Sequence, residues 1–473
     1  MELALLIDIG STYTKASLFD LVNYQLIARS QAYTTVEQDV NRGLAKALAQ
    51  LEGWEKAHYK LACSSAAGGL KIIAIGLVPD LTAEAAKRAA LGAGSKVLKT
   101  YSYQLSTREI AEISQADCDI ILLAGGTDGG DQSNIIHNAR MLADSQLAQP
   151  IIMAGNKSAA DQVITILKQA DKEIYQTGNV MPELEELNIE PARKVIRDLF
   201  LKKIIEAKGL SRVKELVDGV IMPTPAAVLK AAELVATGYN SEKGWGELLI
   251  VDIGGATTDV HSVASGKPTK GGINWRGLTE PYLKRTVEGD LGMRYSALTL
   301  CEAIGTDTLK EQLQGLGWED SGGERYQQQL KSLCRQVDFI PGSKREKLID
   351  ALLGRNAARL AVARHVGKLK TIYTPMGPTY VQEGKDLTTI KYVIGTGGVI
   401  VNNHNPAFIL EGLLYKNQHQ PELLAPVAPE LILDREYLLA AVGLLAGVEP
   451  AASLKIIKKY LAKIELEGFE NDS

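Results

Sequence analysis

The chain carries the same strand-and-turn motif twice, and this repeat limits its possible folds more than any other feature. In each copy a short apolar run ends in an aspartate, which is followed by glycine and by hydroxyl side chains in the same order. The copies read Asp8-Ile9-Gly10-Ser11-Thr12 and Asp252-Ile253-Gly254-Gly255-Ala256-Thr257-Thr258. One such turn is an ordinary strand-to-turn junction, but the pair indicates two related halves that hold a ligand between them.

Both turns have the chemistry of an anion site. Glycine lets the backbone approach a ligand closely, successive backbone amides form an anion-binding nest, and hydroxyl groups rotate to meet phosphate oxygens. We therefore expect phosphate groups to be bound by two sets of residues. These are Gly10, Ser11 and Thr12 in the first turn, and Gly254, Gly255, Ala256, Thr257 and Thr258 in the second.

The two aspartates need a cation if phosphate is the ligand. Ionised Asp8 and Asp252 would repel a phosphate, and Mg²⁺, bound directly or through its water shell, resolves that conflict. We expect both carboxylates to organise the metal. Lys15, which follows the first turn, is a candidate to neutralise a terminal phosphate, and an exposed strand lysine is the alternative interpretation.

Length and composition exclude several classes of protein. A chain of 473 residues predicts two or more domains, and 45% hydrophobic with 23% charged residues is typical of a soluble globular protein. The net charge of −4 and the lack of a basic, aromatic-rich stretch predict no nucleic-acid partner. No apolar run reaches the roughly 18 residues of a membrane span, and the first strand leaves no room for a signal peptide, so we expect a cytoplasmic protein without a membrane partner.

The cysteine and histidine patterns exclude common metal and hydrolase sites. The four cysteines are widely spaced, which argues against a zinc or iron–sulfur site and predicts reduced thiols. The chain also lacks H-E-x-x-H, G-x-S-x-G and P-loop motifs. If it binds a nucleotide, it does so without a P-loop.

Alternating strand and helix patterns predict an α/β protein of two domains. We expect a first domain over residues 1–240 with a helical insertion at about 159–220. A polar link precedes the second domain, which is expected over 241–433 with a helical insertion at about 287–365. Residues 434–473 are predicted to form a helix that crosses between the halves and C-terminal helices that pack back on the first domain.

Two further glycine-rich turns follow apolar runs. One contains Gly125, Gly126, Thr127 and Asp128, and the other is Gly395-Thr396-Gly397-Gly398. Open α/β sheets bind ligands at the carboxyl ends of their strands, so four such ends can converge on one cleft. For the turn at 125–130, a buried glycine loop is the alternative.

At this point the motifs resemble a known superfamily. The turns at Asp8, Asp252 and Gly395 look like the two phosphate motifs and the adenosine motif of acetate and sugar kinases, heat-shock chaperone ATPases and actin. Within that superfamily, the runs 63–70, 124–130 and 287–294 are similar to the MutL/GlmL proteins that accompany adenosylcobalamin-dependent glutamate mutase. The likeness covers essentially the whole chain.

The resemblance implies a two-domain actin-like ATPase fold, a duplicated ribonuclease H-like unit with a nucleotide cleft between the domains. The strand meander expected over 18–28 agrees with it. The implied cofactors are ATP and Mg²⁺, with Asp8 and Asp252 at the metal. Gly395, Gly397 and Gly398 match the adenosine-side loop.

Hydrolysis also requires a group that orients water near the terminal phosphate. The catalytic candidates are Asp8, Asp252, Glu288 and Asp290, and none of them lies in an unmistakable catalytic motif. Asp128 is a further carboxylate of this kind. Capping of a helix start is the alternative role for Glu288 and Asp290.

The function implied by the resemblance is that of an accessory protein. It would be an ATP-dependent reactivating factor, and its partners would be the subunits of an adenosylcobalamin-dependent mutase of the glutamate mutase type. Nucleotide-driven domain motion would open the mutase and exchange damaged cobalamin. The alternative is a small-molecule kinase for a sugar or carboxylate, and a hydantoinase-like hydrolase is a third hypothesis.

Overall fold

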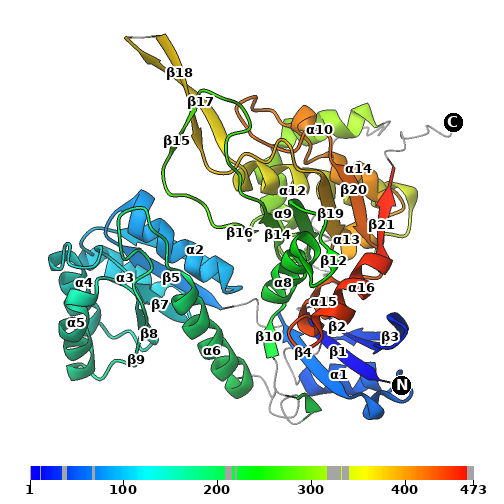
Figure 1. The fold of residues 1–473 in the computed structure, drawn as a ribbon, viewed down its shortest axis with the longest axis horizontal. Helices are drawn as coiled ribbons and strands as arrows, with labels where there is room; N and C mark the ends of the chain where they lie inside the picture. The colour runs from blue at the N-terminus through cyan, green and yellow to red at the C-terminus, as the bar shows by residue number, and fades with distance from the viewer. Residues whose placement is uncertain are drawn as a thin grey trace.

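Two sheets of related topology and a separate parallel sheet make up the protein. The structure is a computed structural model, and it describes residues 2–10, 12–34, 40–65, 70–207, 216–218, 221–316, 332, 340–375 and 377–465. Figure 1 shows a larger body, which contains β1 (Leu3–Ile9) and β21 (Leu461–Ile464), and a smaller lobe, which contains the strands from β5 (Lys71–Gly76) to β9 (Ile174–Gln176).

The first sheet has the order β10-β4-β1-β2-β3. Its strands are β1 (Leu3–Ile9), β2 (Tyr13–Asp20), β3 (Gln25–Tyr33), β4 (Tyr59–Ser64) and β10 (Ile221–Pro223). The first three strands are antiparallel, whereas β4 runs parallel to β1 and β10 parallel to β4. The expected meander is therefore present, and α1 (Val40–Leu48) packs on β2 and β3.

The second sheet repeats this plan. Its order is β16-β14-β13-β19-β20-β21, formed by β13 (Leu248–Ile253), β14 (Thr258–Val263), β16 (Leu283–Glu288), β19 (Tyr392–Thr396), β20 (Glu430–Asp434) and β21 (Leu461–Ile464). Strands β16, β14 and β13 are antiparallel, and β19 and β20 continue in parallel. This repeated topology is a duplicated, actin-like α/β fold, as predicted.

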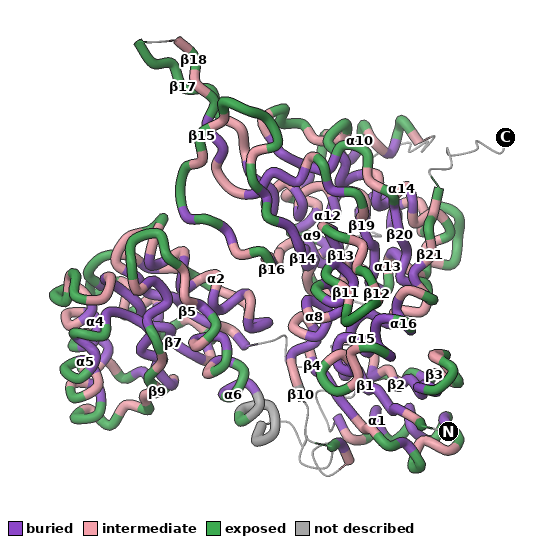
Figure 2. The backbone as a smooth tube through the Cα atoms, in the orientation of Figure 1, coloured by how far each residue is buried: buried purple, intermediate pink, exposed green. Residues whose placement is uncertain are grey.

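Two helices join the halves. Helices α8 (Thr224–Thr237) and α15 (Leu439–Leu445) lie in one buried apolar cluster with residues of β1, β4, β13 and β19. Figure 2 shows this region as buried. A Cβ on Gly443 would lie 1.8 Å from the carbonyl oxygen of Ala227, so only glycine permits this helix crossing.

The smaller lobe has a sheet of its own, which the sequence interpretation did not separate from the first domain. Its order is β6-β5-β7-β8-β9, and all pairs are parallel. The strands are β5 (Lys71–Gly76), β6 (Lys96–Ser102), β7 (Ile120–Leu123), β8 (Ile151–Met153) and β9 (Ile174–Gln176). The lobe's helices are α2 (Glu84–Gly92), α3 (Thr107–Gln115), α4 (Ser133–Ala143), α5 (Lys157–Gln169) and α6 (Glu190–Ala207).

The described residues 159–207 are thus part of an α/β unit, because β9 completes the parallel sheet and α5 and α6 flank it in the sequence. In the described part of residues 287–365, three helices follow β16: α9 (Ala297–Ile304), α10 (Thr306–Gly315) and α12 (Lys344–His365).

The C-terminal segment differs from the expected helices at two places. Strand β20 continues to Asp434, so α15 begins five residues later, at Leu439. After α16 (Pro450–Tyr460), the chain adds β21 antiparallel to β20 of the second sheet. Helix α15 does pack on β1 and β4 of the first sheet.

A small sheet of β15 (Ile273–Arg276), β18 (Gly377–Glu383) and β17 (Lys368–Thr374) projects from the body (Figure 1). Short helices α13 (Gly398–Val401) and α14 (Pro406–Glu411) follow β19. Among the described residues, no helix has both the length and the apolar character needed to cross a bilayer.

The α8–α15 crossing generates a stability prediction. Gly443→Ala places a methyl group against the Ala227 carbonyl and is expected to lower the free energy of unfolding by about 3 kcal/mol. Gly315→Ala is the matched control, because Gly315 is also helical and has no atom within 4 Å of its Cβ position. In urea unfolding, the free energy of unfolding of Gly315→Ala should equal that of the wild type or exceed it by up to about 1 kcal/mol. Equal changes in unfolding free energy for the two substitutions would contradict the packing argument.

Candidate functional site

The two repeated turns have the same backbone geometry and face each other. The Gly10 amide donates to the carbonyl of Tyr13 at 3.0 Å, and the Gly254 amide donates to that of Thr257 at 2.9 Å. A Cβ on Gly255 would lie 3.9 Å from the Thr12 hydroxyl oxygen, so the turns of the two halves are in direct proximity. Ser11 lies outside the described residues.

Lys15 lies at the centre of the site. It is directly opposite Asp8 in the β1–β2 register, and its ammonium lies 3.1 Å from the centroid of the Tyr437 ring. Burial lowers the pKa of Lys15, while the charges of Asp8, Asp252 and Asp434 act in the opposite direction. One cation therefore lies within electrostatic reach of carboxylates from three strand ends, and Lys15 is half-buried, unlike the exposed strand lysine of the alternative interpretation.

Asp8 is buried and fixed from two sides. Its Oδ1 accepts a hydrogen bond from the Thr224 hydroxyl at 2.8 Å and one from the Cys63 thiol at 3.4 Å. Thr224 is the first residue of α8, and Cys63 lies beside Asp8 in the β1–β4 register. The carboxylate is thus held by the strand next to it and by the helix that joins the halves.

Asp252 has an environment that favours its protonated form. Burial and then the negative charge of Asp259, its partner across the β13–β14 hairpin, raise the pKa of Asp252 to about 7. Gly397, which has φ +95°, lies against it, since a Cβ there would be 2.7 Å from Asp252 Oδ1. The glycine turn at 395–398 therefore does contact the second motif.

Asp434 completes the carboxylate group, and the sequence interpretation missed it. It is fully buried, accepts a hydrogen bond from Thr396 Oγ1 at 2.9 Å, and accepts bonds from the amides of Leu438 and Leu439. Burial raises its pKa. A signal was available, because β20 is a third apolar run that ends in aspartate, although no glycine turn follows it.

The segment after β16 supports the second turn. Met293 and Arg294 donate backbone hydrogen bonds to the carbonyls of Gly254 and Gly255 at 3.1 and 2.8 Å. A Cβ on Gly292 would lie 2.3 Å from the Ala256 carbonyl carbon, so glycine is required at this contact. This close approach gives a physical reason for part of the distinctive run 287–294.

Two other residues predicted to bind nucleotide, Thr258 and Gly395, contact neighbouring protein groups instead. The Thr258 hydroxyl is buried and donates to the Leu291 carbonyl at 2.7 Å, which engages it away from a ligand. A Cβ on Gly395 would meet Leu410 in the core, whereas Gly398 begins α13 with only Asn402 nearby.

Glu288 and Asp290 are held by one arginine. Arg364 donates to Glu288 at 2.7 Å and to both oxygens of Asp290 at 2.7 and 2.8 Å. Burial raises the pKa of Glu288, and the hydrogen bonds from Arg364 lower that of Asp290. The two carboxylates form an ion-pair cluster, and catalysis by either remains a prediction.

The turn at 125–130 is placed elsewhere. It follows β7 in the smaller lobe, which lies apart from β1 and β13 in Figure 1. Asn179 donates to the Gly126 carbonyl and to Asp128, and Asn156 accepts from the Gly129 amide. The structure thus brings together the turns at Gly10, Gly254 and Gly397 and holds Gly125, Gly126, Thr127 and Asp128 in a different sheet.

The donor set is compatible with Mg²⁺ bound together with phosphates. Over the described ranges, no three or more His, Cys, Asp or Glu side chains are grouped to hold a metal by themselves. Mg²⁺ in nucleotide sites is held by one or two carboxylates plus substrate phosphates. Asp8 and Asp252, next to the two glycine turns, are the residues that would hold it.

Comparison with known proteins identifies the family. A family model described as MutL protein matches residues 4–461. The chain belongs to the MutL family. This MutL-family chain is 50% identical over 469 residues to Protein MutL of Clostridium tetanomorphum, covering 98% of this chain and 100% of that protein.

Solved structures with similarity over most of the chain have low sequence identity. Component A of (R)-2-hydroxyglutaryl-CoA dehydratase from Acidaminococcus fermentans is 11% identical (97% of this chain, 99% of that chain, TM-score 0.31). A ROK-family glucokinase from Streptomyces griseus, in complex with glucose and AMPPNP, is 11% identical (96% and 98%, TM-score 0.34). A glycerol dehydratase reactivase is 11% identical (94% and 99%, TM-score 0.33). The fold assignment rests on the topology of the two sheets.

The raised pKa of Asp252 predicts a pH dependence of stability. Its folded-state pKa of about 7 lies above the ordinary 3.8, so the stability it contributes is complete below about pH 4 and is lost as the pH rises through 7. Relative to Asp252→Asn, the wild-type protein without nucleotide should therefore lose stability between pH 5 and pH 8 in urea unfolding. Asp117→Asn, in an exposed ion pair, is the control, and its free energy of unfolding should change between pH 5 and pH 8 as that of the wild type does. The prediction would be contradicted if the difference in unfolding free energy between the wild type and Asp252→Asn were the same at both pH values.

Proposed function

We propose that this MutL-family protein is an Mg²⁺-dependent ATPase that acts as a reactivating factor for an adenosylcobalamin-dependent mutase. The observation that carries the ATPase proposal is the meeting of two glycine turns, one from each half, beside Asp8, Asp252 and Lys15. Family membership supports the accessory role.

Each residue has a defined task in this proposal. The amides of Gly10 and Gly254 close their own turns by hydrogen bonds to Tyr13 and Thr257. We therefore assign phosphate binding to the other backbone amides within each turn and to the hydroxyls of Thr12 and Thr257. Lys15 supplies a positive charge next to the phosphates. Bound Mg²⁺ would supply charge neutralisation, with Asp8 and Asp252 as its holders.

We assign the orientation of the hydrolytic water to Asp8 and Asp252, the carboxylates next to the two glycine turns. Glu288 and Asp290 are engaged by Arg364, so they are less available for this step.

Coupling to a mutase follows from the two-half architecture. A ligand bound between two halves favours the arrangement in which both turns contact it, and it shifts the conformational equilibrium by its differential affinity for the two arrangements. A mutase that prefers one arrangement would then be bound or released with nucleotide state, which allows damaged cobalamin to exchange.

The carboxylates provide the first test. Asp8→Asn and Asp252→Asn should each reduce Mg²⁺-dependent ATP turnover by about 100-fold or more, the loss typical of removing one electrostatic group from a phosphoryl-transfer site. ADP release measures turnover, and circular dichroism confirms folding. Asp117→Asn is the control with unchanged turnover; wild-type rates in both site variants would refute the ATPase assignment. Turnover that depends on an added sugar or carboxylate acceptor would instead indicate the kinase alternative.

The partner proposal has a separate test. Affinity for a glutamate mutase-type enzyme loaded with inactive cobalamin should change at least 10-fold among ATP, ADP and nucleotide-free conditions, as measured by surface plasmon resonance. The reason is that nucleotide and mutase bias the same conformational equilibrium. Identical affinities in the three conditions would overturn the reactivation mechanism but leave the ATPase assignment intact.

A further inference from the structure

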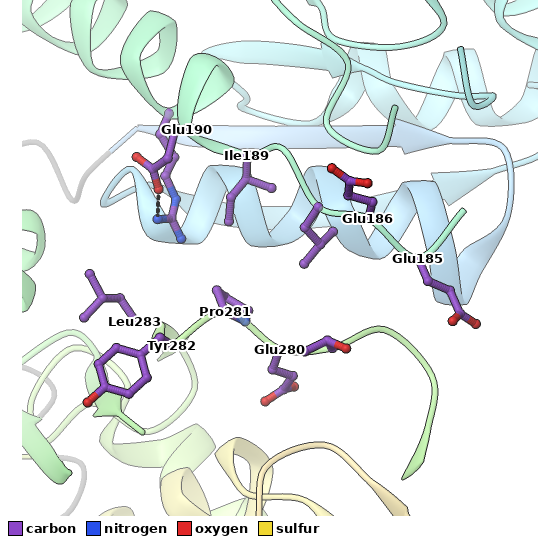
Figure 3. Close-up of a pocket in the computed structure, with 11 residues that line it drawn as sticks. Glu185, Glu186, Ile189, Glu190, Glu280, Pro281, Tyr282 and Leu283 are labelled. Carbon is purple, nitrogen blue, oxygen red and sulfur yellow. Dashed lines mark hydrogen bonds and ion pairs between the residues drawn. The ribbon is translucent and has the colours of Figure 1, made fainter. Parts of the chain in front are cut away.

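The smaller lobe meets the second half of the body along an incompletely packed seam. A cavity of about 430 Å³ lies in this seam and is lined by residues 185–187, 189, 190 and 193 of the lobe and by residues 279–283 of the body. Figure 3 shows the two sets of residues facing each other from separate segments. A contact that leaves such a space is easier to rearrange than a closely packed core.

Two arginines bridge the seam from opposite sides. Arg88 of α2 donates to the Thr279 carbonyl at 3.1 Å and pairs with Glu280 at 3.5 Å. In the other direction, Arg285 of β16 donates from Nη1 to the carbonyls of Leu91 and Ser95, each at 3.0 Å. Arg285 therefore binds the C-terminal end of α2, where the Leu91 carbonyl also accepts a hydrogen bond from the Gly94 amide.

Arg285 also contacts the second hairpin of the candidate site. Its Nε donates to Asp259 Oδ1 at 2.8 Å, and its Nη2 lies 2.6 Å from the same oxygen. The other oxygen of Asp259 accepts a hydrogen bond from the Thr257 hydroxyl at 3.1 Å. Arg285 and Asp259 are both buried, so water does not screen this connection.

We propose that Arg285 couples the occupancy of the second glycine turn to the position of the smaller lobe, through Thr257, Asp259 and the end of α2. The inference rests on the proposed ATPase function, because it assigns to nucleotide the role of the ligand. Arg285 is a positioning residue and touches no phosphate.

The energetics of the guanidinium give the direction of the effect. A hydroxyl of Thr257 that donates to a phosphate no longer donates to Asp259, so the carboxylate shifts and Arg285 must move with it. The bond from Arg285 to a carboxylate is charge-assisted and stronger than its bonds to the neutral carbonyls of Leu91 and Ser95. Arg285 therefore keeps Asp259 and withdraws from α2, and the adjacent cavity gives the lobe room to move.

Hydrogen exchange of the native protein measures this directly. The reporters are the amides of Gly94 and Ser95, which bond to the carbonyls of Leu91 and Ala90 at the end of α2. With Mg²⁺ and a non-hydrolysable ATP analogue, these amides should exchange at least threefold faster than without nucleotide. Nucleotide affinity is measured in parallel with a fluorescent analogue.

Two substitutions at one position keep the test decisive. Arg285→Gln removes the bonds that connect Asp259 with the end of α2, but it also leaves the buried Asp259 without its cation. Arg285→Lys is therefore the second variant, because it retains the positive charge and loses the forked contacts of the guanidinium. In Arg285→Lys the nucleotide response of the reporter amides should disappear while nucleotide still binds. Arg88→Gln is the matched control, since it loosens the same seam without a link to Asp259, and it should retain the threefold response.

The outcomes separate the two proposals. A wild-type protein that binds and hydrolyses nucleotide with no change in exchange at the end of α2, or an Arg285→Lys variant with the full wild-type response, would overturn the coupling and leave the ATPase intact. A wild-type protein that does not bind nucleotide at all would refute both.

Discussion

The structure depends on one buried ammonium group. Lys15 is attracted by the charges of Asp8 from the first sheet and of Asp252 and Asp434 from the second, and its ammonium lies over Tyr437. Charges removed from water are costly unless they are compensated, so a cation among the ends of β1, β13 and β20 stabilises their meeting. The constraint therefore joins the two halves at the same point where the glycine turns meet. It also leaves more carboxylates than cations at that point, an imbalance that the Mg²⁺ of the proposed function would correct.

The duplication is symmetric in backbone and asymmetric in charge. Asp8 faces Lys15 across the first hairpin, whereas Asp252 faces Asp259 across the second. The first hairpin thus places its cation inside the site. The second places a carboxylate there and takes its cation, Arg285, from the neighbouring strand β16. Together with burial, this difference raises the pKa of Asp252, and it accounts for a buried arginine that reaches the smaller lobe.

The sequence was informative where a residue type has a single physical reason. Glycine permits the close approach of Gly397 to Asp252, which the structure confirms, whereas the phosphate and metal roles of Asp8 and Asp252 stay predictions. Gly125 met the same sequence criterion but lies in another sheet, because a glycine turn after a strand does not reveal which sheet the strand joins. The separate parallel sheet was not predicted because an alternation of strands and helices does not show which strands share a sheet, and β9, with three residues, is too short to show a period.

The residues that were missed share a different property: their role comes from a partner far away in the chain. Asp434 follows an apolar run like those before Asp8 and Asp252, but its importance comes from Thr396 and from the start of α15. Arg285 has no motif around it, and only the packing of α2 against β16 places carbonyl groups beside its guanidinium. Local pattern can identify a turn that binds a ligand, since the turn carries its own donors. It cannot identify the side chain that transmits the consequence of binding, because that side chain is defined by two surfaces that meet only in the folded protein.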